Sequence, residues 1–151
     1  MNRFILLLGA LSLFIGISSA CVFENCLCDA TEFLYIEDCP KGVGFPRRSP
    51  NDDTSQIETL DLDELGLESI PEDQLDGLSV SYLDLSKNQI TELKANTFKG
   101  AKIMQLSIKD NQIRRIDPNT FKPLTTINEL WLSGNELSRM SKLILILLDI
   151  N

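Results

Sequence analysis

The chain has 151 residues, of which 43% are hydrophobic and 24% are charged, with 22 acidic residues, 14 basic ones and no histidine. This size suits a single globular domain. The net charge of −8 argues against nucleic acid, anionic membrane surfaces and heparin-like polyanions as general partners. Without histidine, the chain lacks the side chain most often used for general acid–base catalysis.

The N-terminus has the composition of a secretory signal peptide. Arg3 is followed by an apolar run over residues 4–17 and by small residues that end at Ala20. This order predicts export and cleavage after Ala20, which leaves 13 basic and 22 acidic residues and a net charge of −9. The run is shorter than the ~20 residues of a membrane span. A bacterial lipoprotein signal, with Cys21 as the lipidated residue, is the competing interpretation.

All four cysteines lie in one short segment, at Cys21, Cys26, Cys28 and Cys39. In an exported chain, an even and clustered set of cysteines predicts two disulfides. Four thiolates could instead bind zinc, but the C-x-C spacing differs from the usual C-x2-C knuckle. The sequence alone allows three ways of pairing these cysteines.

The segment between the cysteines and the first repeated element predicts one strand and a long loop. Residues 33–36 are expected to form a strand that pairs alongside residues 60–62. Residues 40–56 are rich in Pro, Gly, Ser, Asn and Arg, which predicts a loop. Within it, Arg47 and Arg48 fit either a proteolytic processing site or two solvent-exposed cations.

From residue 57 onward the sequence repeats itself. Triplets that begin at Leu60, Leu83, Leu106 and Leu130 recur at offsets of 23, 23 and 24 residues. A fixed position five residues after each of these holds Leu65, Asn88, Asn111 and Asn135. The predicted repeats span residues 57–79, 80–102, 103–126 and 127–148, and a tail follows at 149–151.

The pattern within each repeat predicts one coil of a stack. Alternation around each triplet predicts a short strand with its aliphatic side chains inward. Asparagine can satisfy backbone groups that successive coils leave open, so we expect a ladder that Leu65 interrupts. Three apolar columns follow: Ile70, Leu93, Ile116 and Met140; Leu75, Phe98, Phe121 and Leu145; Leu78, Ala101, Leu124 and Leu148. Their spacing predicts a short helix or 3₁₀ turn that closes each coil, with Phe98 and Phe121 stacked in the core.

The repeated pattern L-x-x-L-x-L-x-x-N-x-L resembles that of extracellular leucine-rich repeat proteins, such as Slit-type repeats, chondroadherin and its matrix relatives, and receptor ectodomains. The resemblance covers about residues 21–148. It implies a short right-handed α/β solenoid with a parallel concave sheet and a cysteine-rich cap over residues 21–56. It also implies disulfides that join Cys21 to Cys28 and Cys26 to Cys39, and a secreted protein that binds another protein.

The outward positions of the strands would line the concave face, where we expect the function. The candidate protein-binding residues are Asp61, Asp63, Tyr82, Asp84, Gln105, Ser107, Glu129 and Trp131. Asp61 and Asp84 are expected side by side, because neighbouring strands lie ~4.8 Å apart, with Asp63 and Glu64 close by. Carboxylates crowded without a partner in the chain indicate a waiting cation, either a basic protein surface or Ca²⁺, although a solvated acidic face fits the same pattern. Tyr82 and Trp131 are expected to flank the polar middle of this surface as binding anchors.

The sequence predicts a binding protein and not an enzyme, without catalytic, cofactor or metal residues. It contains no Gly-rich phosphate loop, nucleophile elbow or metal-ligand motif. The expected role is protein binding in matrix, development or innate recognition. The alternatives are a non-catalytic accessory subunit of a secreted enzyme, similar in plan to that of a luciferin monooxygenase complex, and a truncated or spliced fragment of a longer receptor.

The C-terminal segment departs from the family pattern, because no second cysteine-bearing cap follows Met140. An apolar run begins at Leu143 and ends at Leu148. This run fits a truncated or alternatively spliced product, a docking surface that includes self-association, or an improvised cap over the open end of the stack.

Overall fold

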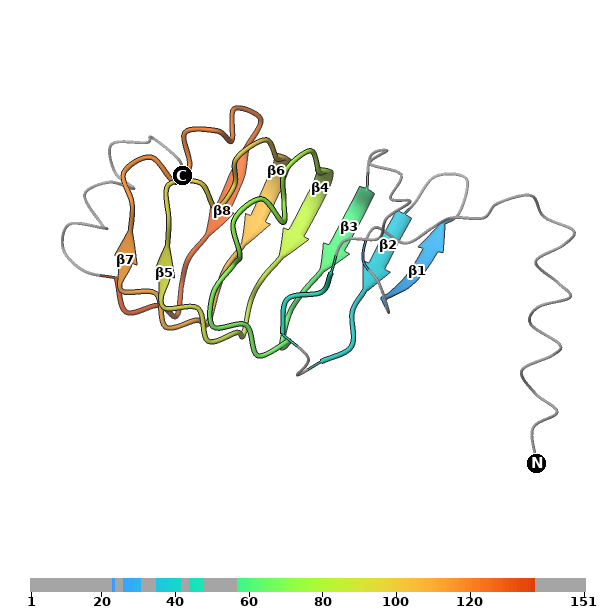
Figure 1. The fold of residues 1–151 in the computed structure, drawn as a ribbon, viewed down its shortest axis with the longest axis horizontal. Helices are drawn as coiled ribbons and strands as arrows, with labels where there is room; N and C mark the ends of the chain where they lie inside the picture. The colour runs from blue at the N-terminus through green and yellow to red at the C-terminus, as the bar shows by residue number, and fades with distance from the viewer. Residues whose placement is uncertain (1–22, 24–25, 31–34, 42–43, 48–56, 138–151) are drawn as a thin grey trace, which may run out of the picture.

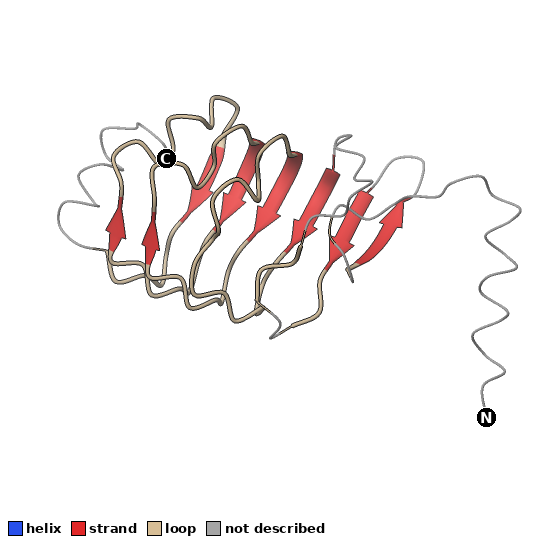
Figure 2. Cartoon of the chain, in the orientation of Figure 1, coloured by secondary structure: helices blue, strands red, loops and turns tan. Residues whose placement is uncertain are grey.

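The computed structural model describes residues 23, 26–30, 35–41, 44–47 and 57–137, with residues 27–30 and 35–38 described by their backbone alone. These residues form a stack of coils, each of which contributes one strand to the same face (Figure 1). The described part of the chain contains eight strands and no helix (Figure 2).

Six strands form one sheet, in the order β1 (Leu27–Ala30), β2 (Tyr35–Asp38), β3 (Ile57–Asp61), β4 (Ser79–Asp84), β6 (Lys102–Ser107) and β8 (Glu129–Trp131). β1 and β2 pair antiparallel, and every later pair in this sheet is parallel. The short strands β5 (Glu92–Leu93) and β7 (Arg115–Ile116) pair parallel in a second sheet. The described chain is therefore a small parallel-strand solenoid of about three turns.

The register of the large sheet places equivalent residues of the repeats opposite one another. The first leucines of the triplets pair in the order Leu60, Leu83, Leu106 and Leu130. Beyond the strands the coils stay bonded, since the N–H of Leu62 donates to the carbonyl of Asp84 at 2.8 Å. The offsets of 23, 23 and 24 residues therefore describe the step from one coil to the next.

The inward aliphatic residues and the three far-side columns form one continuous core. In the first three coils every residue of those columns is at most 6% exposed. The rings of Phe98 and Phe121 lie 5.9 Å apart at an interplanar angle of 17°, which confirms the predicted stack. Met140, Leu145 and Leu148, which complete the columns in the sequence, lie outside the described residues.

The described coils contain no short helix on the far side, which corrects that alternative of the prediction; they close through separate turns whose hydrogen bonds join residues three apart, as in a 3₁₀ turn. In the second coil the N–H groups of Thr97, Lys99 and Ala101 each donate to the carbonyl three residues earlier, at 3.1 to 3.2 Å. These bonds occur at every second residue, whereas a 3₁₀ helix requires consecutive ones. Residues 94–101 must also cross from β5 back to β6, so the chain turns repeatedly and does not run along one axis.

Asparagine side chains tie each coil to the one before it, as predicted. The amide oxygen of Asn88 accepts the N–H of Leu67 at 3.0 Å, and its amide nitrogen donates to the carbonyls of Leu62 and Leu85 at 2.9 and 3.0 Å. In the same way, the amide oxygens of Asn111 and Asn135 accept the backbone N–H groups of Ile90 and Ile113. Buried backbone groups between the coils are therefore satisfied by side chains. Leu65, at the same position in the first coil, is buried in the core.

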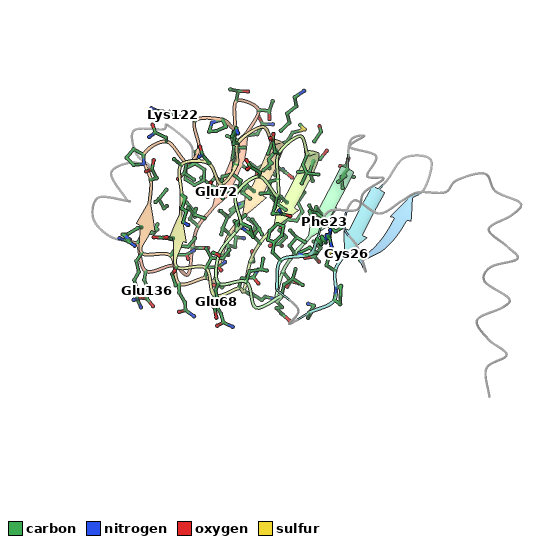
Figure 3. The ribbon with its side chains drawn as sticks, in the orientation of Figure 1. Phe23, Cys26, Glu68, Glu72, Lys122 and Glu136 are labelled. Carbon is green, nitrogen blue, oxygen red and sulfur yellow. A yellow bond between two sulfur atoms is a disulfide. The ribbon has the colours of Figure 1, made fainter. Side chains whose placement is uncertain are left out.

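The N-terminal cap lengthens the sheet by a hairpin. β2 pairs parallel to β3, with Asp38 opposite Asp61, so the predicted cap strand lies alongside the first coil but at residues 35–38. A disulfide joins Cys26 to Cys39, which is one of the two pairs that the resemblance implies. Phe23 is fully buried and lies close to Cys26 at this end of the stack (Figure 3).

Several predictions from the sequence fall on residues that the structure does not describe. These are the signal peptide, Cys21, residues 33–34, Arg48, most of the 40–56 loop and the fourth repeat after Leu137. The side chain of Cys28 is also outside the described set, so the pair with Cys21 stays a prediction. A search of the described residues finds no helix that is long and apolar enough to cross a membrane.

Candidate functional site

The outward positions of the large sheet form rows that run from coil to coil. One row contains Thr59, Tyr82, Gln105 and Glu129, and the next contains Asp61, Asp84, Ser107 and Trp131. Seven of the eight predicted binding residues belong to these two rows. The eighth is Asp63. It lies two residues after the end of β3, at the edge of the same face.

The rings of Tyr82 and Trp131 contact each other, which corrects the expectation that they stand apart on either side of a polar middle. Their ring centroids lie 6.2 Å apart with an interplanar angle of 74°, an edge-to-face contact. Tyr82 is on β4 and Trp131 is on β8, with β6 between them. The rings can lean together because the residue of β6 in the Trp131 row is the small Ser107.

Neighbouring polar groups hold both rings in place. The hydroxyl of Tyr82 donates to Oδ2 of Asp84 at 2.8 Å, and Oδ1 of Asp84 accepts the backbone N–H of Ser86, also at 2.8 Å. The ammonium of Lys109 lies 5.3 Å from the ring centroid of Trp131, within the range of a cation–π interaction. Burial and then the hydrogen bond to Asp84 raise the pKa of Tyr82 to about 12.

Ser107 is not an exposed binding residue, in contrast to the prediction from its position. Only 2% of its surface is exposed, and its hydroxyl lies 2.7 Å from the hydroxyl of Ser86, which is also buried. The ring of Trp131 and the strand neighbour Asp84 stand on either side of it in the sheet. Ser107 therefore supports the surface from beneath. Gln105 and Glu129 form the exposed side, joined by a hydrogen bond of 3.0 Å from Nε2 to Oε1.

The structure places Asp61 and Asp84 opposite each other on adjacent strands, as predicted. Oδ1 of Asp61 accepts the N–H of Asp63 at 3.0 Å, just as Oδ1 of Asp84 accepts the N–H two residues after it. Each carboxylate therefore caps the turn that follows its own strand. Both are partly buried in the sheet surface, so they retain a face toward solvent.

The acidic residues at the edge of the sheet do have cationic partners within the chain, which corrects the expectation of unpaired carboxylates. Lys41 Nζ lies 3.0 Å from Asp63 and 3.3 Å from Glu64, and Lys87 Nζ lies 2.9 Å from Glu64 and 3.4 Å from Asp63. Hydrogen bonds from Lys87 and then from Lys41 lower the pKa of Glu64, and the bond to Asp63 raises the pKa of Lys41. This cluster is electrically balanced and links the cap to two coils.

Glu64 and Lys87 belong to a column of residues with left-handed backbone. The residue before each asparagine position has positive φ: Glu64 at 54°, Lys87 at 55°, Asp110 at 52° and Gly134 at 73°. This conformation costs roughly 1–2 kcal/mol for a residue with a side chain. The sequence gives one hint of it, the glycine at position 134.

Lys87 could have been found as a partner of Glu64 because it lies one repeat later, whereas nothing in the loop sequence singles out Lys41.

The described residues contain no group of three or more His, Cys, Asp or Glu side chains placed to hold a metal ion. Ca²⁺ prefers six to eight oxygen ligands. Asp61 and Asp84 alone do not supply such a set, so the geometry gives the calcium interpretation no support. What the face does present is a fixed aromatic pair beside two carboxylates.

Residues 79–137 match the family model for the leucine rich repeat. The match begins at β4 and covers the second and third coils and the described part of the fourth. No curated protein matches the chain. Leucine-rich repeats are consistent with protein–protein recognition, and the family match together with the stacked parallel coils supports a leucine-rich repeat protein.

Proposed function

We propose that this is a secreted recognition protein that binds another protein through the concave face of its sheet. The observation that carries the proposal is the Tyr82–Trp131 contact at 6.2 Å, fixed by Asp84 and Lys109. Tyrosine and tryptophan are the side chains most enriched at energetic hot spots of interfaces. Rings that are already held in one arrangement lose little conformational freedom on binding, so more of the contact energy appears as affinity.

The shape of the aromatic pair favours a protein partner over a sugar. Carbohydrate rings stack on the open face of an aromatic side chain, but the Trp131 ring has Lys109 over it and Tyr82 against it. The pair therefore presents ring edges and corners. Such an uneven surface fits the pockets of a folded protein.

The charges around the aromatic pair favour a partner with a basic surface. Asp61 and Asp84 lie on one side of the pair and Glu129 lies beside Trp131. Lys41 and Lys87 are occupied at the sheet edge by Asp63 and Glu64. Opposite charge on the partner would speed association, and the rate would fall as salt concentration rises.

Secretion and a non-catalytic role belong to the same proposal. The N-terminal sequence has the parts of a signal peptide, and the Cys26–Cys39 disulfide suits an oxidising compartment. Expression of the full chain in a secreting cell, followed by N-terminal sequencing of the protein in the medium, tests this. Cys21 should be the first residue, and retention of an uncleaved chain in the cell would contradict secretion.

The binding proposal is tested with an array of extracellular domains and three forms of the protein. These are the unchanged chain, Trp131→Ala, and Lys122→Ala as a matched control on the far side of the coil (Figure 3). We expect at least one partner whose Kd rises about tenfold or more with Trp131→Ala, equivalent to about 1.4 kcal/mol, and stays unchanged with Lys122→Ala. Partners that are equally sensitive to both changes, or an array without any Trp131-dependent partner, would contradict the proposal.

A further inference from the structure

Met104 is an exposed hydrophobic residue on the large sheet. The residue is 42% exposed, and every other large hydrophobic side chain that the structure describes is buried or partly buried. A single exposed hydrophobic residue is ordinary on a protein surface. This one, however, lies on β6, the strand between Tyr82 on β4 and Trp131 on β8. Its position on the strand between the two rings makes it a candidate for the same interface.

The side chain of Met104 points away from the core. Ile103 and Leu106, which enclose Met104 and Gln105 in the sequence, are both 0% exposed and belong to the core. Met104 and Gln105 therefore both stand on the outer side of β6. Gln105 lies opposite Tyr82 in the sheet register. Met104 is thus one residue along its strand from the row that contains the tyrosine.

The backbone of Met104 is fixed, whereas its side chain stays accessible. Its carbonyl accepts the N–H of Asn128 at 2.7 Å, which ties β6 to the start of the next strand. The equivalent position on β4 holds Ser81, whose hydroxyl donates to Oε2 of Glu58 at 3.2 Å. A serine side chain is too short to cover a methionine on the neighbouring strand. The thioether is therefore held at a defined place on the surface and open to solvent.

We propose that Met104 is a contact residue for the partner and that oxidation of its thioether by a hydroperoxide weakens binding. This inference rests on the proposed binding role of the concave face. Methionine has a flexible and polarisable side chain, which adapts to irregular binding surfaces. Together with the aromatic pair, it extends the apolar part of the interface along β6.

The charges near Met104 indicate which side chain of the partner it meets. Glu129 lies opposite Gln105 on the adjacent strand β8, and its Oε1 accepts from that glutamine at 3.0 Å. Glu58 is also exposed, and its bond to Ser81 draws its carboxylate from β3 toward β4. A lysine or arginine of a basic partner can lay its aliphatic stem on Met104 and bring its charged end to one of these carboxylates.

Oxidation removes this apolar support. One oxygen atom passes from the hydroperoxide to the sulfur, so an S–O bond forms as the O–O bond breaks. The sulfur loses two electrons, and the hydroperoxide, whose proton moves to the departing oxygen, leaves as an alcohol or as water. The product, methionine sulfoxide, is polar. An aliphatic stem then packs against a solvated S–O group, and the affinity of the partner falls.

Peptide mapping by mass spectrometry tests the modification without a partner. The full, disulfide-bonded chain is treated with dilute hydrogen peroxide, and the added oxygen at Met104 is followed over time. Because the side chain is exposed, we expect its oxidation rate to lie within about tenfold of that in an unstructured peptide of the same sequence. Stronger protection in the folded protein would show that the thioether is covered and would overturn the proposal.

Binding to a Trp131-dependent extracellular domain tests the consequence. We expect peroxide treatment to raise the Kd of the unchanged protein by about fivefold or more. Met104→Gln should raise the Kd similarly without peroxide. Met104→Leu is the matched control, because it keeps the apolar surface but cannot be oxidised, so its Kd should be the same before and after treatment.

The outcomes separate this inference from the binding proposal on which it rests. A Trp131-dependent partner whose Kd is unchanged by Met104→Gln and by peroxide would overturn the role of Met104 and leave the binding proposal intact. A loss of affinity that Met104→Leu shows equally after peroxide would place the sensitive group elsewhere and also overturn it. The absence of any Trp131-dependent partner would contradict the binding proposal itself, and this inference with it.

Discussion

Replacement of Asn111 by leucine removes one rung of the asparagine ladder. The side chain of Asn111 is buried between the second and third coils. Its oxygen accepts the N–H of Ile90 at 3.0 Å, and its nitrogen donates to the carbonyls of Leu85, Lys109 and Ile108 at 3.0, 3.0 and 3.4 Å. Leucine fills a similar volume and is found naturally at the equivalent position of the first coil, so the change isolates the hydrogen bonds from the packing.

The magnitude depends on which groups keep another partner. The Leu85 carbonyl also accepts from Asn88, the Ile108 carbonyl also accepts from Asn135, and the Lys109 carbonyl also accepts a backbone N–H. Each of these carbonyls loses one hydrogen bond but keeps another partner, so each good bond that is lost costs about 0.5–1.5 kcal/mol of stability. The N–H of Ile90 loses its acceptor in a buried place, which costs about 1–3 kcal/mol. With two good carbonyl bonds and one orphaned N–H, we therefore expect Asn111→Leu to lower the free energy of unfolding by about 2–6 kcal/mol.

Urea denaturation of the oxidised protein measures this loss, with Gln112→Leu as the control. Gln112 is the exposed neighbour of Asn111, and its change should stay within about 0.5 kcal/mol. The reverse exchange, Leu65→Asn, should also destabilise the protein, because it buries a polar side chain where leucine packs in the core. If Asn111→Leu were as mild as the control, the ladder would not stabilise the stack and the reasoning would be wrong.

Three further predictions concern the core, a close backbone contact and the aromatic pair. Phe98→Ala should cost about 3–5 kcal/mol in urea denaturation, because the ring is fully buried; a loss below about 1 kcal/mol would contradict its place in the core. Gly134→Ala should cost more than Gly77→Ala in the same assay: both have positive φ, but only at Gly134 would a Cβ meet Asp110. Tyr82 should titrate near pH 12 in ultraviolet difference spectra against Tyr82→Phe. Because the folded state holds that proton more tightly, stability should fall as pH rises from about 10 to about 12, and equal pH dependence in Tyr82→Phe would count against it.

The sequence predicts most of the coil architecture because each structural role recurs at a fixed offset. Phe98 and Phe121 were expected to stack from their 23-residue separation alone, and their rings do so. The hydrogen bonds of Asn88 follow from the chemistry of an amide at a buried turn. A structural role that recurs in four repeats can be read from four sequence positions, so a wrong assignment in one repeat is visible by comparison with the other three.

The parts that the sequence did not predict are those that belong to one coil alone. The contact of Tyr82 with Trp131 depends on two large rings meeting over a small residue, and no periodic signal encodes it. The reach of Lys41 from the cap to Asp63 depends on a loop path that composition does not fix. The closing turns were predicted as a helix or 3₁₀ turn because apolar spacing of three or five residues fits either structure, and only the hydrogen bonds distinguish them.

These non-repeating contacts are also the ones that make this face of the large sheet differ from coil to coil. The ladder and the core are shared between coils, so they fix the sheet without selecting a partner. The pair of Tyr82 and Trp131 rests on that fixed sheet, and Asp84 connects the two levels, because it accepts both a backbone N–H of its own turn and the hydroxyl of Tyr82. Loss of the Asp84 carboxylate would therefore free the ring and the turn together. Because folding has already restricted the side chains of Tyr82 and Trp131, a partner that binds these rings would lose little affinity to further ordering of them.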